Sequence, residues 1–266
     1  MAMFGPRRYK IYRYKALKSQ GIEFMKILCI SFKEQPEVNR KILAYDIFKR
    51  TKETKIDLVI FPGNFLKIPK SIKDEEWISD FAEKNNIHVF YEKFVTENGK
   101  NNYYELYSKF GSKNTCRQLF VDSSEVETNS ELCESLIQKI DNGDRTINVG
   151  GVNFGIIICG ENNVLKNLQL EDNRVIWRCM SPNNWNAEVI LNPSHNTMGN
   201  WGKLQKRFEF LSNKYGYVIY LTNSSCQGFG KSSLKIYNKG REIKNSDNPD
   251  FVTDDKNAIA CILEII

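Results

Sequence analysis

The sequence Phe154-Gly-Ile-Ile-Ile-Cys-Gly-Glu-Asn162 has the character of a buried β-strand that ends at a cysteine. A short apolar run of this kind is typical of a strand that is covered on both faces. Gly160 then predicts a turn directly after Cys159, because glycine adopts backbone conformations that other residues avoid. A thiol at the mouth of a buried strand is well placed to act as a nucleophile, so Cys159 is the first candidate catalytic residue.

The composition bounds the class of protein. The chain has 266 residues, of which 41% are hydrophobic and 12% aromatic, enough for one large domain or two small ones. No apolar run approaches the roughly 18 residues needed to span a bilayer. The first residues lack the apolar region of a secretory signal. We therefore expect a cytoplasmic protein.

The seven cysteines do not form a recognisable framework. They are odd in number, scattered, and never spaced as Cys-x-x-Cys, so they indicate neither a disulfide scaffold nor a zinc site. We expect most of them to be buried reduced thiols, and only the flanks of Cys159 argue otherwise. They are Cys29, Cys116, Cys133, Cys159, Cys179, Cys226 and Cys261.

The positive charge is concentrated at the N-terminus. Residues 1–24 carry all but one unit of the net charge of +6, so residues 25–266 are nearly neutral. This argues against nucleic-acid binding by the main domain. Residues 1–24 interleave basic and aromatic side chains, and either form a basic amphipathic helix that contacts an anionic membrane or polyanion, or a frayed extension. Met25 would then be a natural start for the folded domain, which we place at residues 25–266.

From Met25 onward, predicted strands and helices alternate, which indicates one domain of mixed α/β class with helices over the faces of a sheet. Asp74 is a candidate N-cap. Helices are predicted at residues 37–50, 74–85, 130–140 and 203–214, and strands at 26–32, 57–61, 87–95, 103–107, 117–121, 146–159 (a hairpin), 188–191, 217–222, 233–237 and 258–265.

The order of several short motifs resembles the nitrilase superfamily, the carbon–nitrogen hydrolases. The motifs are Asp57-Leu-Val-Ile-Phe-Pro62, Gly155-Ile-Ile-Ile-Cys-Gly-Glu161, Val189-Ile-Leu-Asn-Pro-Ser194, Tyr217-Val-Ile-Tyr-Leu-Thr-Asn223 and Gly228-Phe-Gly-Lys-Ser-Ser-Leu-Lys-Ile-Tyr-Asn-Lys-Gly240. The resemblance covers roughly residues 25–266. It implies a single-domain α-β-β-α sandwich, a homodimer, a small-molecule substrate, a Glu-Lys-Cys triad, and no metal or organic cofactor.

The family's catalytic residues carry over unevenly. Cys159 falls on the nucleophile, but where the family has its glutamate after Phe61-Pro62 this chain has Gly63 and then Asn64. The best-placed cation for the family's lysine is Arg117, with Lys109 and Lys113 in the apparent turn before it. An auxiliary acid would be Glu125 or Glu127.

His195 is the best substitute for the missing base, because it follows Asn192-Pro193-Ser194 at the end of a strand that in this family lies beside the nucleophile. A Cys159–His195 dyad would result; the alternative is a surface-loop histidine. We expect Gly63, Asn64, Gly160 and Glu161 to line the substrate site, although an acid at the position of Glu161 more often orders the turn.

Two functions remain open from the sequence. One is a cysteine hydrolase or acyl transferase that attacks an amide-type C–N bond through a thioester at Cys159, with Arg117 and the Gly160 N–H stabilising the oxyanion. The other is a pseudoenzyme that keeps the fold and binds a ligand or partner. Loss of a positioned base typically costs about 10²- to 10⁴-fold in rate, so the choice depends on what activates the thiol.

Overall fold

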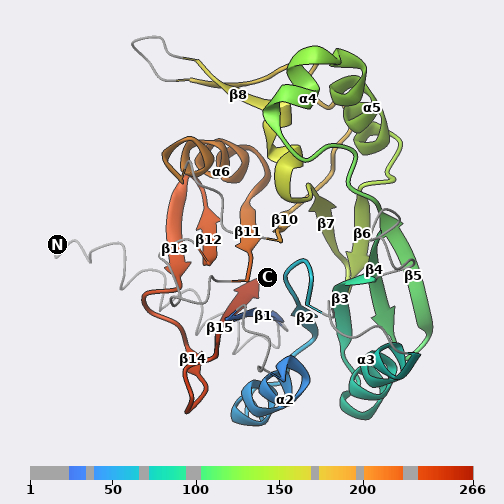
Figure 1. Ribbon diagram of the computed structural model, residues 1–266, viewed down its shortest axis with the longest axis vertical. Helices are drawn as coiled ribbons and strands as arrows, with labels where there is room; N and C mark the ends of the chain where they lie inside the picture. The colour runs from blue at the N-terminus through green and yellow to red at the C-terminus, as the bar shows by residue number, and fades with distance from the viewer. Residues whose placement is uncertain are drawn as a thin grey trace, which may run out of the picture.

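Two β-sheets stacked face to face form the centre of the molecule (Figure 1). The computed structural model describes residues 24–33, 39–65, 72–93, 103–168, 174–195, 201–223 and 233–265. The predicted N-terminal extension, apart from Phe24, lies outside these residues. None of the described helices is long and apolar enough to cross a membrane.

The first sheet has the strand order β14-β15-β1-β2-β3-β4-β5. Strands β1, β2 and β3 are parallel to one another, and the remaining neighbours pair antiparallel. The strands are β1 (Met25–Phe32), β2 (Leu58–Ile60), β3 (His88–Lys93), β4 (Tyr103–Ser108), β5 (Gly111–Cys116), β14 (Phe251–Val252) and β15 (Ala258–Ile265).

The second sheet has the order β13-β12-β11-β10-β7-β6, with β7, β10 and β11 parallel. A separate two-stranded ribbon joins β8 (Leu165–Asn167) to β9 (Val175–Trp177). The strands of the second sheet are β6 (Thr146–Val149), β7 (Val152–Ile156), β10 (Val189–Pro193), β11 (Tyr217–Leu221), β12 (Leu234–Asn238) and β13 (Arg241–Asn245).

Helices cover the outer face of each sheet. Helices α2 (Arg40–Arg50) and α3 (Ile72–Asn85) pack on the first sheet, at the bottom of Figure 1. Helices α4 (Ser123–Thr128), α5 (Ser130–Asp141) and α6 (Trp201–Tyr215) cover the second sheet, at the top. The described residues therefore form the expected α-β-β-α sandwich.

Three element boundaries differ from the sequence-based predictions. Helix α2 begins at Arg40 with Asn39 as its cap, while residues 37 and 38 lie outside the described residues. Asp74 is not an N-cap, because α3 already begins at Ile72. The strand predicted at residues 117–121 is wrong: Gly111, with φ of 103°, lets β5 start directly after the turn, so the polar residues that follow it pair with β4 and residues 117–121 form an irregular segment.

The carboxyl ends of the parallel strands of both sheets meet. The hydroxyl of Ser31, in β1, donates to the carbonyl of Thr222 at 2.6 Å, and the N–H of Gly63, after β2, donates to the carbonyl of Ser194 at 3.1 Å. The side chain of Asn223 donates to the carbonyl of Gly63 at 2.7 Å. These bonds between the sheets fix the edge at which the candidate residues gather.

Candidate active site

Cys159 lies in the turn that the sequence predicts. It follows β7 as the first residue of a short 3₁₀-helix, Cys159–Val164, and its φ is 39°. A non-glycine residue at positive φ is strained, and such strain is concentrated at functional sites. Gly160 is required for space rather than for conformation, because a Cβ there would lie 1.8 Å from the carbonyl oxygen of Val121.

His195 bonds to a carboxylate that the sequence analysis did not identify. Its Nε2 lies 2.8 Å from Oε1 and 2.9 Å from Oε2 of Glu92. Glu92 belongs to β3 and is 2% exposed. Because a carboxylate accepts hydrogen bonds, Nε2 carries a proton toward it, which leaves Nδ1 as the ring nitrogen for another partner.

That partner is the thiol of Cys159. Burial alone would raise the pKa of the Cys159 thiol, but hydrogen bonds from the His195 side chain and backbone and from the Ser194 side chain lower it below its ordinary value. Burial alone would lower the pKa of His195, but its bonds to Cys159 and Glu92 raise this pKa to about 10. Both shifts favour the same species, a thiolate beside an imidazolium.

Cys159 differs in this respect from the other described cysteines. Burial raises the pKa of Cys116, Cys133 and Cys261 to about 11. The pKa values of Cys29 and Cys179 are raised as well, again mainly by burial. Among the described residues, Cys159 is thus the thiol that is activated; Cys226 lies outside them.

The space that the family's glutamate would use is occupied by His195. A Cβ built on Gly63 would lie 2.5 Å from Cδ2 and 3.0 Å from Nε2 of His195, and 2.9 Å from the hydroxyl oxygen of Tyr104. The imidazole therefore fits only because residue 63 has no side chain. The loss of the family's acid and the presence of His195 are two sides of one arrangement.

Asn64 contributes through its backbone. Its φ is 58°, and its N–H donates to Oε2 of Glu92 at 2.6 Å. Since Oε2 also bonds to His195, the loop after β2 holds the carboxylate that orients the imidazole. Gly63 and Asn64 are thus brought to the site as predicted residues, but Asn64 supports Glu92.

Glu161 orders the turn. It is fully buried, and its carboxylate pairs with Arg145 through two bonds, of 2.8 and 2.9 Å. It also accepts the backbone N–H groups of Leu119 at 2.7 Å and Ile158 at 2.8 Å. The substrate-binding role predicted for Glu161 does not fit this geometry, because both carboxylate oxygens face protein donors.

The charge of Arg145 is secured by the same contact. Burial alone would lower the pKa of Arg145, but the carboxylate of Glu161 more than offsets this, and the pKa is raised. Arg145 also donates to the carbonyl of Arg117 at 2.8 Å. The pair therefore ties the segment after β5 to the turn that carries Cys159.

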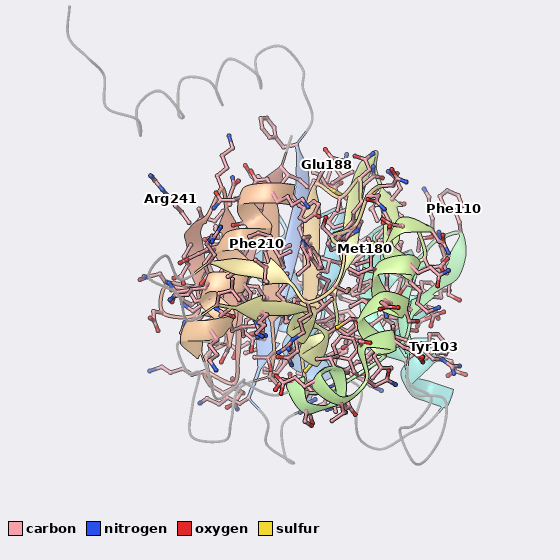
Figure 2. The ribbon with its side chains drawn as sticks, turned by 90° about the horizontal axis from the view of Figure 1, so that it is seen from above. Tyr103, Phe110, Met180, Glu188, Phe210 and Arg241 are labelled. Carbon is pink, nitrogen blue, oxygen red and sulfur yellow. The ribbon has the colours of Figure 1, made fainter. Side chains whose placement is uncertain are left out.

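The structure does not bring Arg117 to the thiol. Its side chain is exposed, and its guanidinium lies 6.0 Å from the ring centroid of Tyr103, which Figure 2 shows at the edge of the molecule. Tyr103 and Tyr104 point to opposite faces of β4, and Tyr104 is the one that faces the core between the sheets. The predicted role of Arg117 beside the nucleophile is therefore wrong.

The predicted auxiliary acids have structural partners. Glu125 accepts the N–H of Val121 at 2.6 Å, and Glu127 pairs with Arg178 at 2.9 Å. Lys109 and Lys113 are exposed on the β4–β5 hairpin. Among the described residues, no group of His, Cys, Asp and Glu side chains is arranged to hold a metal ion.

Glu92 carried a signal in the sequence. In the strand His88-Val-Phe-Tyr-Glu-Lys93, Phe90 and Glu92 share a face, and Phe90 packs in the core between the sheets. A carboxylate on an inward face is costly unless it is paired, which marks it as a candidate partner for a cation. Tyr104 and Arg145 carried no comparable signal, because their neighbours come from distant segments.

Comparisons with known proteins support the fold. No family model matches the sequence, and no curated protein matches it. Solved structures do match. A glutamine-dependent NAD(+) synthetase from Cytophaga hutchinsonii is 15% identical, with a TM-score of 0.56 over 91% of this chain and 43% of its own, so this chain spans less than half of that protein.

Two other matches have nearly the same length as this chain. XC1258 from Xanthomonas campestris, a CN-hydrolase superfamily protein with an arsenic adduct in its active site, is 10% identical, with a TM-score of 0.57 over 92% of this chain and 91% of its own. The Nesterenkonia AN1 amidase from the nitrilase superfamily is 11% identical, with a TM-score of 0.55 over 91% and 90%. At these identities the likeness concerns the backbone, and it shows that this chain has the fold of the nitrilase superfamily.

Proposed function

We propose that this protein is a cysteine-dependent hydrolase of a non-peptide amide-type C–N bond, acting through a thioester at Cys159. The observation that carries the proposal is the chain of contacts from Glu92 to His195 to Cys159, together with the lowered pKa of this thiol. Nucleophile, base and orienting group in sequence are the general arrangement of nucleophilic catalysis. The amidase likeness adds support for the bond type, since one related structure shows acrylamide added to its active-site cysteine.

The proposed reaction has two halves. The Cys159 thiolate attacks the carbonyl carbon, so an S–C bond forms and the C=O electron pair moves to oxygen. When this intermediate collapses the C–N bond breaks, and the His195 imidazolium gives its proton to the leaving nitrogen. Neutral His195 then accepts a proton from water that attacks the thioester, which releases the acid and restores the thiolate–imidazolium pair. The backbone N–H of Gly160 remains a proposed oxyanion donor.

Glu92 holds the imidazole for both halves. Its carboxylate stabilises the protonated ring electrostatically and orients Nδ1 toward the thiol, as in triads on other folds. This replaces the family's glutamate by a different base in the same space. The thiol thus has a partner even though residue 63 is glycine.

The test is capture of the thioester. The full-length protein is mixed with a panel of amides, nitriles and carbamoyl compounds and analysed by intact-protein mass spectrometry, with product release measured in parallel. We expect an acyl adduct and turnover with the wild type, neither with Cys159→Ala, and both with Cys179→Ala, which removes another partly exposed thiol. Absence of both adduct and turnover across the panel would favour the ligand-binding pseudoenzyme instead.

A further inference from the structure

A row of side chains crosses the first sheet at the level of the site. In the register of the sheet, Glu92 in β3 is paired with Tyr104 in β4, and Tyr104 is paired with Cys116 in β5. Directly paired residues share a face, so the three side chains point toward the second sheet. Tyr104 is the middle member, and its ring belongs to the core cluster against which Cys159 packs.

The hydroxyl of Tyr104 is buried without use in the fold. Tyr104 is 1% exposed, and among the described residues its hydroxyl oxygen has no hydrogen-bond partner. The ring alone does the packing, stacked on Phe90 with centroids 5.5 Å apart. An unsatisfied buried hydroxyl typically costs about 1–3 kcal/mol, so phenylalanine would serve the fold better.

The same hydroxyl lies at the reacting groups. It is 2.9 Å from the point that a Cβ on Gly63 would occupy, and that point is 3.0 Å from Nε2 of His195. Phenol and imidazole therefore face one small space beside the thiol. Cys159 and Glu92 are among the groups whose charge acts on the Tyr104 hydroxyl.

We propose that the Tyr104 hydroxyl donates a hydrogen bond to the oxyanion that forms when Cys159 adds to an acyl carbonyl. The inference rests on the proposed function and names a residue that supplies electrophilic assistance at that same site. The thiolate electron pair forms the S–C bond, the C=O pair becomes the oxyanion, and the phenol keeps its proton throughout. When the C=O bond reforms, the hydroxyl is released unchanged.

The surroundings suit this role. Burial raises the pKa of Tyr104 well above its ordinary value, so the hydroxyl remains a neutral donor at neutral pH. Of the nearby cations, Arg117 is exposed on the opposite face of β4, and Arg145 is committed to Glu161. A buried donor that is already fixed in place is worth more to a developing charge than one in water.

The test uses two reagents that reach the same thiol by different chemistry. p-Nitrophenyl acetate acylates Cys159 through a tetrahedral oxyanion and releases a measurable burst of p-nitrophenolate. Iodoacetamide alkylates Cys159 by displacement at a saturated carbon, with no oxyanion. In Tyr104→Phe we expect the acylation rate to fall about 100-fold, the typical loss for one oxyanion donor, and the alkylation rate to stay within about 2-fold of wild type.

Tyr215→Phe is the matched control. Its hydroxyl is also buried without a partner among the described residues, but it lies on α6, where its ring packs on Trp185 at 4.8 Å. Both rates should be unchanged in this variant. Equal acylation by Tyr104→Phe and wild type would overturn the proposal, and so would an equal loss of both rates, which would show that the hydroxyl acts on the thiol rather than on the oxyanion. A wild type without a burst would instead overturn the proposed function, and this inference with it.

Discussion

Individual residues at this site have exchanged roles within one small volume. The imidazole of His195 fills the space in which the family's glutamate is expected, and Gly63 is the residue that makes this room. Glu92 supplies a carboxylate from a different strand, so a negative charge is still present but acts through the histidine. A site of this kind is read correctly only when the missing side chain and its replacement are considered together.

Gly63→Ala tests this exchange. The added Cβ would lie 2.5 Å from the imidazole, which is held by Glu92 and must shift, so we expect at least a 10-fold slower alkylation of Cys159 at neutral pH. The control is Gly202→Ala, because a Cβ at Gly202 meets nothing within 4 Å and should leave the rate unchanged. Iodoacetamide labelling followed by peptide mass spectrometry measures both variants. Unchanged labelling in Gly63→Ala would mean that the imidazole does not need this space.

At the scale of elements, the turn after β7 is fixed from outside itself. Glu161 accepts the N–H of Leu119, and Arg145, just before β6, bonds to both Glu161 and the carbonyl of Arg117. The irregular segment after β5 and the turn that holds Cys159 therefore behave as one unit. The buried ion pair between them is the contact whose loss should be felt most.

We expect Glu161→Gln to lower the free energy of unfolding by about 3–5 kcal/mol, because it leaves a buried guanidinium without its counter-charge. The matched control is Glu127→Gln, which breaks the pair with Arg178 at a carboxylate that is 57% exposed and should cost at most about 1 kcal/mol. Urea unfolding followed by circular dichroism measures both. A loss below about 1 kcal/mol in Glu161→Gln would contradict a structural role for this pair.

Local patterns were sufficient for most elements but not for the site. Alternating apolar runs and helical spacing placed the strands of both sheets and helices such as α5 within a few residues. The segment after β5 was mistaken for a strand, because an apolar Leu119-Phe120 pair resembles one, whereas Phe120 packs as an anchor beneath α4 and α5. Glu92 was overlooked, since its partner His195 is distant in sequence and the contact exists only once the two sheets are stacked.

At the scale of the whole molecule, the site is a property of the sandwich. Gly63, Glu92 and Tyr104 come from the first sheet, and Cys159 and His195 from the second, so neither sheet contains it alone. The bonds of Gly63 to Ser194 and Asn223 hold these two edges together. The predicted extension, residues 1–24, has no assigned part in this assembly.

Starting the chain at Met25 should therefore leave the protein folded and its site intact. We expect the melting temperature to change by no more than about 2 °C and the alkylation rate of Cys159 to stay the same, because residues 25–266 are predicted to be the folded domain. Differential scanning calorimetry and iodoacetamide labelling measure the two effects. A large drop in melting temperature would show that the extension packs on the domain.

The most direct test of an activated Cys159 is the pH dependence of its alkylation by iodoacetamide. The lowered pKa of Cys159 and the raised pKa of His195, about 10, predict a thiolate–imidazolium pair across neutral pH. The wild-type rate should thus exceed that of every other cysteine at pH 7, change little up to about pH 9, and fall only as the pH drops through the lowered pKa of the thiol. In His195→Asn the thiol loses its counter-charge, so the rate at pH 7 should fall and the rise should move to higher pH. Labelling of Cys159 no faster than that of the other cysteines, or a pH profile unchanged in His195→Asn, would contradict this account.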